Sequence, residues 1–257
     1  MLVRCEKSLR QTRVDRICQK YDVPFINLSY EATTTVELGG EVFPQIRLPS
    51  ILLEGNLVTI PVMKTHDKTT ITGALKNQWG CLPKSRHMYH LVVSRAIVEL
   101  NTALRPRFAV MDATISLEGN GPKSGRPRVT DLVLASRDLV AIDSVEARLM
   151  GFDPMQIEHL VLAEKAGLGH ANPEQITLVG DSIEGVNFGF RRARSNLVSV
   201  VERRLRHSRF KRLAFEGPLF WLACRGALVF YFFWYNLIGR KLKDQILAHP
   251  FYGPQWR

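Results

Sequence analysis

Between residues 23 and 180, short apolar runs alternate with stretches that have helical periodicity. We expect extended segments at 23–29, 45–55, 56–62, 108–114, 131–136 and 176–180. Helical patterns lie between them, as at 86–104, where apolar residues recur at helical spacing. Strands that alternate with helices predict an α/β domain with a layered, largely parallel sheet flanked by helices. The 257 residues of the chain suffice for one such domain, which we place at 1–190, and a basic, hydrophobic helical tail at 191–257.

A group of polar donors follows the most apolar of these strands. The stretch VMKTHDKTTITGALKNQWG, residues 62–80, continues directly from LVTIP. In open α/β sheets, ligands bind beyond the carboxyl ends of the strands. Lysines, threonine hydroxyls and backbone amides near a glycine suit a phosphate or carboxylate better than a free metal cation. The orders GxxxxGK[ST] and GxGxxG are both missing, so a polar surface loop is the alternative. The ligand-binding candidates are Lys64, Thr65, Thr72, Gly73, Lys76 and Asn77.

Two acidic residues belong to the same predicted site. Asp112 stands at the expected end of the strand 108–114, and a loop rich in glycine and proline follows. Glu118 precedes Gly119 and Gly121, which permit close backbone approach and join the ligand-binding set. We expect Asp112 and Glu118 to meet the lysine-rich stretch across one crevice, where they would handle protons or a divalent cation. His66 completes the predicted catalytic set, although the roles of general base, metal ligand and hydrogen-bonded loop residue all stay open for it.

Further titratable residues have structural interpretations. Asp143 is expected to cap a helix, with Glu146 three residues later completing a capping box. His87 and His90 are spaced i, i+3 on a predicted helix, so they are either surface residues or a pair that shares a metal.

The linked stretches VTIPVMKTHDKTTITGALKNQWGCLP, VMDATISLEGNGPKSGRP and DLVLASRDLVAIDSVEARLMGFDP, followed by AEKAGLG, resemble the DUF362 family over roughly residues 10–190. The elements KTH, GALKN, MDA and EGNGP come in the family's order. The resemblance implies an α/β fold with a site at the lysine-rich stretch, but the family's reaction is undefined. Some members are fused to iron–sulfur ferredoxin modules, so a redox role with an external iron–sulfur partner is one alternative. Because members usually begin with a further βα region, the resemblance also implies that this chain lacks an N-terminal βα portion.

The C-terminal tail accounts for most of the net charge of +11. Residues 191–212 hold nine lysines and arginines against the single acid Glu202. The apolar stretch 217–239 follows, with Trp221, Tyr231, Trp234 and Tyr235 at positions that suit a membrane interface. As a helix it would span about 34 Å, but Arg225 and the glycines bring insertion close to break-even. A full span, an interfacial helix, and a helix packed on the domain or a partner chain all remain open.

The remaining composition limits cofactors and location. Four scattered cysteines without a CxxC pair argue against a local iron–sulfur cluster or structural zinc, and indicate reduced thiols. The charged N-terminus lacks the apolar core of a signal peptide, so we expect a cytoplasmic, membrane-associated protein. RNP, KH and zinc-knuckle patterns are missing, which argues against nucleic acid. The expected partners are a small anionic molecule and the membrane surface, with a protein partner or homo-oligomer also open. A non-enzymatic scaffold is the main alternative function.

Overall fold

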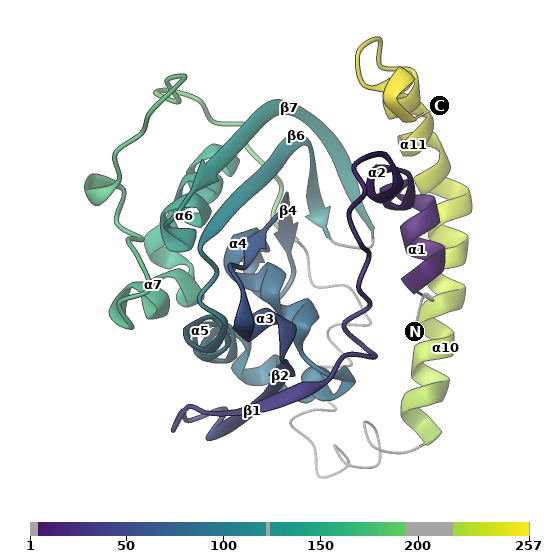
Figure 1. Ribbon diagram of the computed structural model, residues 1–257. Coiled ribbons are helices and arrows are strands. Elements are labelled where there is room, and N and C mark those ends of the chain that lie inside the picture. The colour runs from purple at the N-terminus through teal and green to yellow at the C-terminus, as the bar shows by residue number, and fades with distance from the viewer. Residues whose placement is uncertain (1–4, 122–123, 194–217, 257) are drawn as a thin grey trace.

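The computed structural model describes residues 5–121, 124–193 and 218–256, whose arrangement is shown in Figure 1. Most of the basic run 191–212 therefore lies outside the described residues. A five-stranded mixed sheet forms the centre of the molecule, and it confirms the predicted α/β class. Strands β3 (Val58–Thr59) and β4 (Val62–His66) run parallel to β6 (Phe108–Asn120). Strands β5 (Thr70–Ile71) and β7 (Ser124–Ser136) pair antiparallel with β4 and β6.

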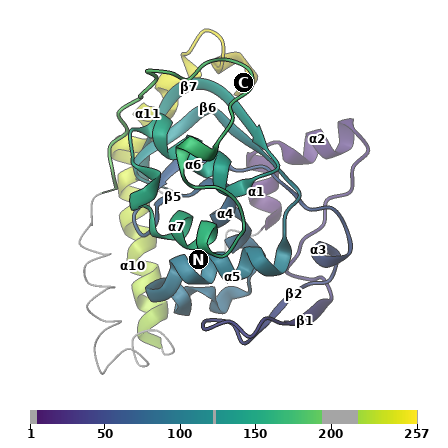
Figure 2. The same cartoon turned by 90° about the vertical axis from the view of Figure 1, so that its left-hand side faces the viewer.

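Four helices build the layer against one face of this sheet. Helices α4 (Gly73–Asn77) and α6 (Leu139–Met150) contact the strands, while α5 (Val93–Leu104) and α7 (Glu158–Lys165) pack against them. Figure 2 looks onto this layer. The core between helices and sheet is apolar, with Met63, Ile97 and Met111 fully buried. Alternating side chains of β4 and β6 point into it, because successive residues of a strand face opposite sides.

The strand predicted at 108–114 is longer than the sequence analysis indicated. β6 continues to Asn120 and pairs with β7 through positions such as Glu118 with Arg126, so Asp112 lies in mid-strand instead of at a strand end. The predicted loop is therefore wrong. Ile115 and Leu117 continue the alternation of a strand, and a register shift near Ala113 and Ile115 absorbs the irregularity.

Three other predicted strands differ from the structure. Residues 23–29 and 176–180 are not in strands, so neither apolar run pairs with a sheet. Val179 is 96% exposed. The segment 45–55 divides into β2 (Gln45–Pro49) and the short helix α3 (Ile51–Glu54). β2 pairs antiparallel with β1 (Thr33–Glu37), a two-stranded unit that the sequence analysis missed.

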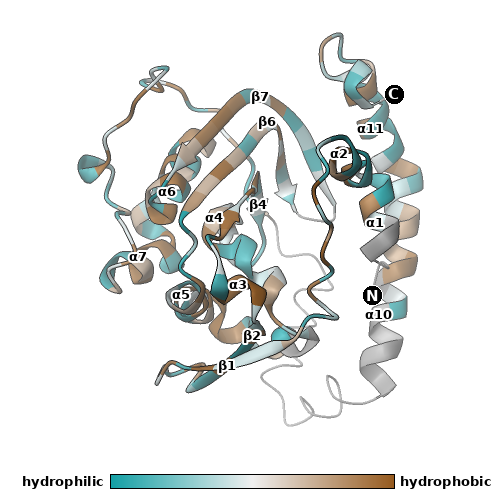
Figure 3. Cartoon of the chain, viewed as in Figure 1, coloured by the Kyte–Doolittle hydropathy of each residue, from teal (hydrophilic) through white to brown (hydrophobic). Residues whose placement is uncertain are grey.

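The C-terminal helices stand beside the sheet. Helix α10 (Pro218–Trp234) continues through a π-helical turn, Tyr235–Gly239, into α11 (Arg240–Leu247), which packs on β7. Hydrophobic residues colour much of α10 in Figure 3. In the described ranges, no helix is long and apolar enough to cross a membrane.

Two hydrogen bonds tie the end of the chain to the rest of the molecule. The Tyr252 hydroxyl donates to Asp131 on β7. The Arg13 guanidinium donates to the carbonyl of Trp256 at 2.9 Å. Arg13 lies between the N-terminal helices α1 (Cys5–Gln11) and α2 (Val14–Lys20), so both ends of the described chain meet here.

Helix α4 is held in place by a carboxylate from α6. The Asp143 oxygens accept hydrogen bonds from the backbone N–H groups of Ala74 at 2.5 Å and Leu75 at 3.0 Å. Asp143 was expected to cap its own helix, but that role belongs to Asp138, which accepts from Val140 and Ala141 at 2.8 Å each. Asp143 instead satisfies the first amides of α4, where the helix dipole favours negative charge.

Gly73 permits this close approach, since it has φ +59° and an added Cβ would collide with the Asp143 carboxylate. We predict that Gly73→Ala destabilises the domain by roughly 2–4 kcal/mol, from backbone strain together with the steric clash. Gly80→Ala is the matched control, because a Cβ at Gly80 meets nothing within 4 Å. Urea unfolding measures both variants. An unfolding midpoint of Gly73→Ala equal to that of Gly80→Ala would contradict the packing described.

Candidate functional site

The lysine-rich stretch folds into a hairpin followed by a short helix. β4 ends at His66, residues 67–69 make the turn, and β5 pairs back through His66 with Thr70. Thr70 adopts φ 64°, which is strained for a β-branched residue. Helix α4 begins two residues after β5. The polar stretch therefore includes β4 itself, with Lys64, Thr65 and His66 in the strand, and continues through the turn and β5 into α4.

Several basic side chains of this hairpin and helix lie close together. The charges that act on Lys76 come from Asp67, Lys64, Lys68 and Arg86, and those that act on His66 come from Lys76, Lys68, His90 and Lys64. We call Lys64, Lys68, Lys76 and Arg86 the cationic cluster. Its acidic neighbours are Asp67, whose carboxylate lies 3.8 Å from Lys68 Nζ, and Glu146, which acts on Lys64.

Lys76 is the most buried member of the cationic cluster, with only 7% of its surface exposed. Its Nζ lies 5.9 Å from the centre of the Trp79 ring, in cation–π range. Within the described residues, no ion pair to a carboxylate is formed by Lys76. Burial is the largest effect and lowers the pKa of Lys76 to about 8. Asp67 opposes this shift, while Lys64, Lys68 and Arg86 add to it.

His66 is neutral at physiological pH. Burial first, then the positive charges of Lys76 and Lys68, lower the pKa of His66 to about 2. Nδ1 accepts a hydrogen bond from the Lys68 backbone N–H at 3.1 Å, so the neutral ring carries its proton on Nε2. Asp67 Oδ1 lies 3.1 Å from the same Nδ1. With a pKa of about 2 the ring is a very weak base, so it stays neutral and can donate a hydrogen bond through Nε2.

Buried polar atoms near the cationic cluster lack hydrogen-bond partners. They are the Thr72 hydroxyl, the Trp79 indole N–H and both ring nitrogens of His159. Burial, and to a smaller extent Lys76, lower the pKa of His159 to about 3. Native proteins satisfy nearly all such groups, so these atoms, which have no partner among the described residues, are candidates for contact with a ligand or with water.

The other predicted ligand-binding residues have structural partners. The Thr65 hydroxyl donates to the carbonyl of Gly119 at 2.8 Å, and the Asn77 amide donates to Thr59 at 2.8 Å. Gly121 lies so close to the Thr65 carbonyl that a Cβ would not fit. These residues, together with Gly73, shape the backbone around the cationic cluster.

The two predicted carboxylates, Asp112 and Glu118, are not part of the cationic cluster. The prediction that they share one crevice with the lysine-rich stretch is therefore corrected. Asp112 projects from the other face of β6, is exposed, and accepts from the Thr114 N–H and hydroxyl at 2.9 and 2.6 Å. Glu118 is 8% exposed and contacts Arg128 at 3.3 Å and the Arg191 backbone N–H at 3.1 Å. Asp112 therefore forms a local turn, and Glu118 ties the segment near Arg191 to the sheet.

Two acids of α6 lie near these elements: Glu146 acts on Lys64, and Asp143 accepts from the first amides of α4. Glu146 Oε1 accepts from the Lys64 backbone N–H at 3.1 Å, and Glu146 is fully buried. Burial raises the pKa of Asp143 to about 7, and burial together with Asp143 raises the pKa of Glu146 well above its ordinary value. The sequence did contain a signal for these buried acids, because they stand three residues apart within the otherwise apolar helix LVAIDSVEARLM.

Arg86, Trp79 and His159 were also missed as site residues. Trp79 lies within the stretch 62–80, three residues after Lys76, whereas no spacing in the sequence links Arg86 and His159 to that stretch. His90 stacks on Trp79 with ring centres 6.4 Å apart, whereas the side chain of His87 lies outside the described part of the structure. Among the described residues, no group of three histidine, cysteine or acidic side chains is placed to hold a metal ion.

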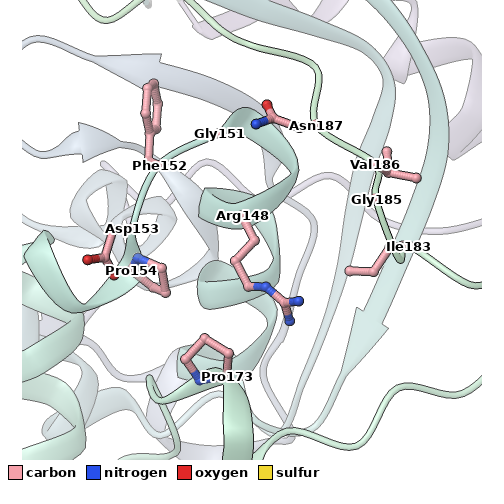
Figure 4. A pocket seen from close by; sticks show the side chains of 10 residues that line it. All are labelled: Arg148, Gly151, Phe152, Asp153, Pro154, Pro173, Ile183, Gly185, Val186 and Asn187. Carbon is pink, nitrogen blue, oxygen red and sulfur yellow. The ribbon is translucent and has the colours of Figure 1, made fainter.

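A separate cavity of about 380 Å³ opens at the carboxyl end of α6 (Figure 4). Arg148, Phe152, Asp153 and Asn187 are among its lining residues, and none of the cationic cluster takes part. Asn187 Oδ1 already accepts from the Gly189 N–H at 2.7 Å. The cavity has one cationic side chain, compared with four in the cationic cluster, and so ranks second as a site.

The fold and the site define an α/β protein with a partly buried cationic cluster at the carboxyl end of a sheet strand. The chain belongs to the DUF362 family, a domain of unknown function whose profile matches residues 3–148. A curated relative is the thylakoid-associated protein sll1697 of Synechocystis sp. (strain ATCC 27184 / PCC 6803 / Kazusa), which is 29% identical over 161 residues. The match covers 59% of this chain and 49% of the relative, so the chain spans about half the relative's length. No solved structure matches.

The raised pKa values on α6 have a consequence for stability. Asp143 titrates at 3.8 when unfolded and about 7 when folded, so the folded state binds more protons between these values. Stability therefore falls as pH rises from about 4 to 7, by up to about 1.4 kcal/mol per pH unit for each proton. Glu146 adds to the same trend.

We predict that Glu146→Gln makes this pH dependence shallower, because it removes one of the two titrating groups while keeping the acceptor for Lys64. Urea midpoints at pH 5 and pH 7 measure the effect. Glu158→Gln, at an exposed position of α7, is the control and should follow the unaltered protein. An equal or steeper fall of stability between pH 5 and pH 7 in Glu146→Gln would contradict the raised pKa of Glu146.

Proposed function

We propose that the cationic cluster binds a small anionic molecule carrying a phosphate or carboxylate group. The main observation concerns Lys76. Only 7% of its surface is exposed, and it forms no ion pair with a carboxylate among the described residues. Buried charges in native proteins are paired, and desolvation of an unpaired ammonium is costly. An anion of the right size supplies the missing partner.

The charge balance of the cationic cluster supports this proposal. Four basic side chains act on one another here, and Asp67 is the one ionised acid among the groups that shift Lys76. Burial raises the pKa of Glu146 well above its ordinary value, which lessens its negative charge. A bound dianion would bring the site close to neutrality. The partly exposed side chains of Lys64, Lys68 and Arg86 leave a route to solvent.

Two buried hydrogen-bond donors that lack a partner among the described residues also support an anion site. The Thr72 hydroxyl and the Trp79 indole N–H are each more than nine-tenths buried without a partner. Both belong to the segment around α4 that holds Lys76. Hydroxyl and indole donors suit phosphate or carboxylate oxygens, which accept hydrogen bonds only.

We predict that sulfate and phosphate bind the protein and that Lys76→Met weakens binding about 10–100-fold, since a hydrogen bond to a charged group contributes about 1.5–3 kcal/mol. Calorimetric titration measures this, with acetate as the carboxylate probe. Lys165→Met, at an exposed position of α7, is the control. Sulfate binding should weaken as pH rises through about 8, where Lys76 loses its charge. Equal affinity in Lys76→Met would refute the proposal.

We further propose that the C-terminal helices attach the protein to an anionic membrane surface. Phe232, Phe233 and Leu237 are 65%, 57% and 68% exposed, and Arg240 and Lys241 are exposed just beyond them. Aromatic and aliphatic side chains next to basic ones are typical of helices that lie in the membrane interface. The name of the relative, a thylakoid-associated protein, supports the same function for this chain.

We predict that the full chain sediments with phosphatidylglycerol-containing vesicles and that Phe232→Ser/Phe233→Ser reduces this binding roughly tenfold or more. Burying a phenylalanine contributes about 1.5–3 kcal/mol. Val179→Ser, which alters an exposed apolar residue away from the tail, is the control. Binding should also decrease at high salt. Unchanged sedimentation of the double variant would exclude α10 as the attachment site.

A further inference from the structure

Lys76 combines three properties that a purely electrostatic contact does not require. Its amine is 7% exposed, no carboxylate ion pair holds it among the described residues, and it lies beside the flat Trp79 ring. Lysines of this kind serve as nucleophiles, because desolvation and neighbouring cations keep a fraction of the amine uncharged. The other two lysines of the cationic cluster, Lys64 and Lys68, differ from Lys76 in this respect because they are only partly buried.

We infer that Lys76 forms an imine with the carbonyl group of a small oxo acid, whose carboxylate or phosphate is held by Lys64, Lys68 and Arg86. This inference rests on the proposed anion site and names its substrate class: an aldehyde or ketone that carries an acidic group. The cationic cluster positions the acid, and the buried amine attacks the adjacent carbonyl. The Trp79 ring offers an apolar surface next to the reacting carbon.

The surroundings of Lys76 set the protonation state that the reaction needs. The charged and titratable groups that act on it or respond to it are Asp67, Lys64, Lys68, Arg86, His66 and His159. Cations outnumber the acid, and both histidines are neutral. With a pKa of about 8, a substantial part of Lys76 is free amine at neutral pH, unlike an exposed lysine.

The chemical step balances without any further reagent. The Lys76 Nζ lone pair attacks the carbonyl carbon, and a C=N double bond replaces the C=O double bond. The carbonyl oxygen leaves as water with the two hydrogens that the neutral amine gives up. The protonated imine then withdraws electrons from a neighbouring C–H or C–C bond, which is the usual purpose of lysine imines in enzymes.

Reductive trapping tests the inference on the full-length protein. Glyoxylate or pyruvate is added together with cyanoborohydride, which reduces an imine to a stable amine, and peptide mass mapping locates the adduct. We expect Lys76 to be modified at least about tenfold faster than the exposed Lys165, because more of its amine is uncharged. The Lys76 trapping rate should rise with pH toward 8 and then level off. Excess sulfate should suppress it by occupying the cationic cluster.

Lys76→Arg keeps the positive charge and removes the nucleophile. It should lose the rapid adduct, whereas the control Lys165→Arg, at an exposed position of α7, should keep both the rapid adduct and sulfate binding. Modification of Lys76 no faster than Lys165, or an equally rapid adduct in Lys76→Arg, would overturn the inference. If sulfate binds but no rapid adduct forms, the imine fails and the anion site stands. If sulfate does not bind at all, the proposed function itself fails.

Discussion

Two backbone N–H groups at the start of α4 donate to the Asp143 carboxylate, and the position of the candidate site depends on this contact. Helix α4 has five residues, too few for a helix to be stable by its own hydrogen bonds. The carboxylate satisfies its first amides, while Glu146 accepts from the Lys64 amide on the neighbouring strand. α6 thereby fixes Lys64 and Lys76 relative to each other, and Gly73 makes room for the contact. The raised pKa values of both acids show the electrostatic cost of placing them in the core.

The same arrangement explains why the basic side chains lie close together without forming ion pairs with the carboxylates of α6. Lys64 and His66 alternate with the buried Met63 and Thr65 along β4 and are themselves partly exposed. The hairpin adds Lys68, and α4 carries Lys76 back to the same place. The carboxylates on α6 are buried and accept from backbone N–H groups, and Asp67 lies 3.8 Å from Lys68 Nζ. The site is thus built with an excess of positive charge that a ligand can balance.

The α/β class could be predicted from the sequence because it follows from local patterns, and the lysine-rich stretch stays a proposed site. Apolar alternation marks strands, and a polar stretch at the end of a buried strand marks a ligand site. Long-range pairing was not predictable in the same way. The Gly/Pro-rich stretch after Asp112 forms a long hairpin, since Ile115 and Leu117 find partners on β7. The role of Asp143 depends on where α4 docks, and the contributions of Trp79 and His159 depend on packing between separate elements. No spacing along one chain reports such contacts.

Heteronuclear NMR of the lysine side chains measures the central feature of this account, the state of Lys76 in the presence and absence of an anion. The account predicts that the Lys76 amine titrates near 8 in the free protein and that saturating phosphate moves its pKa upward, because a bound anion stabilises the ammonium form. Lys165, at an exposed position of α7, is the control and should not respond to phosphate. A Lys76 that titrates like Lys165 and does not respond to phosphate would contradict it.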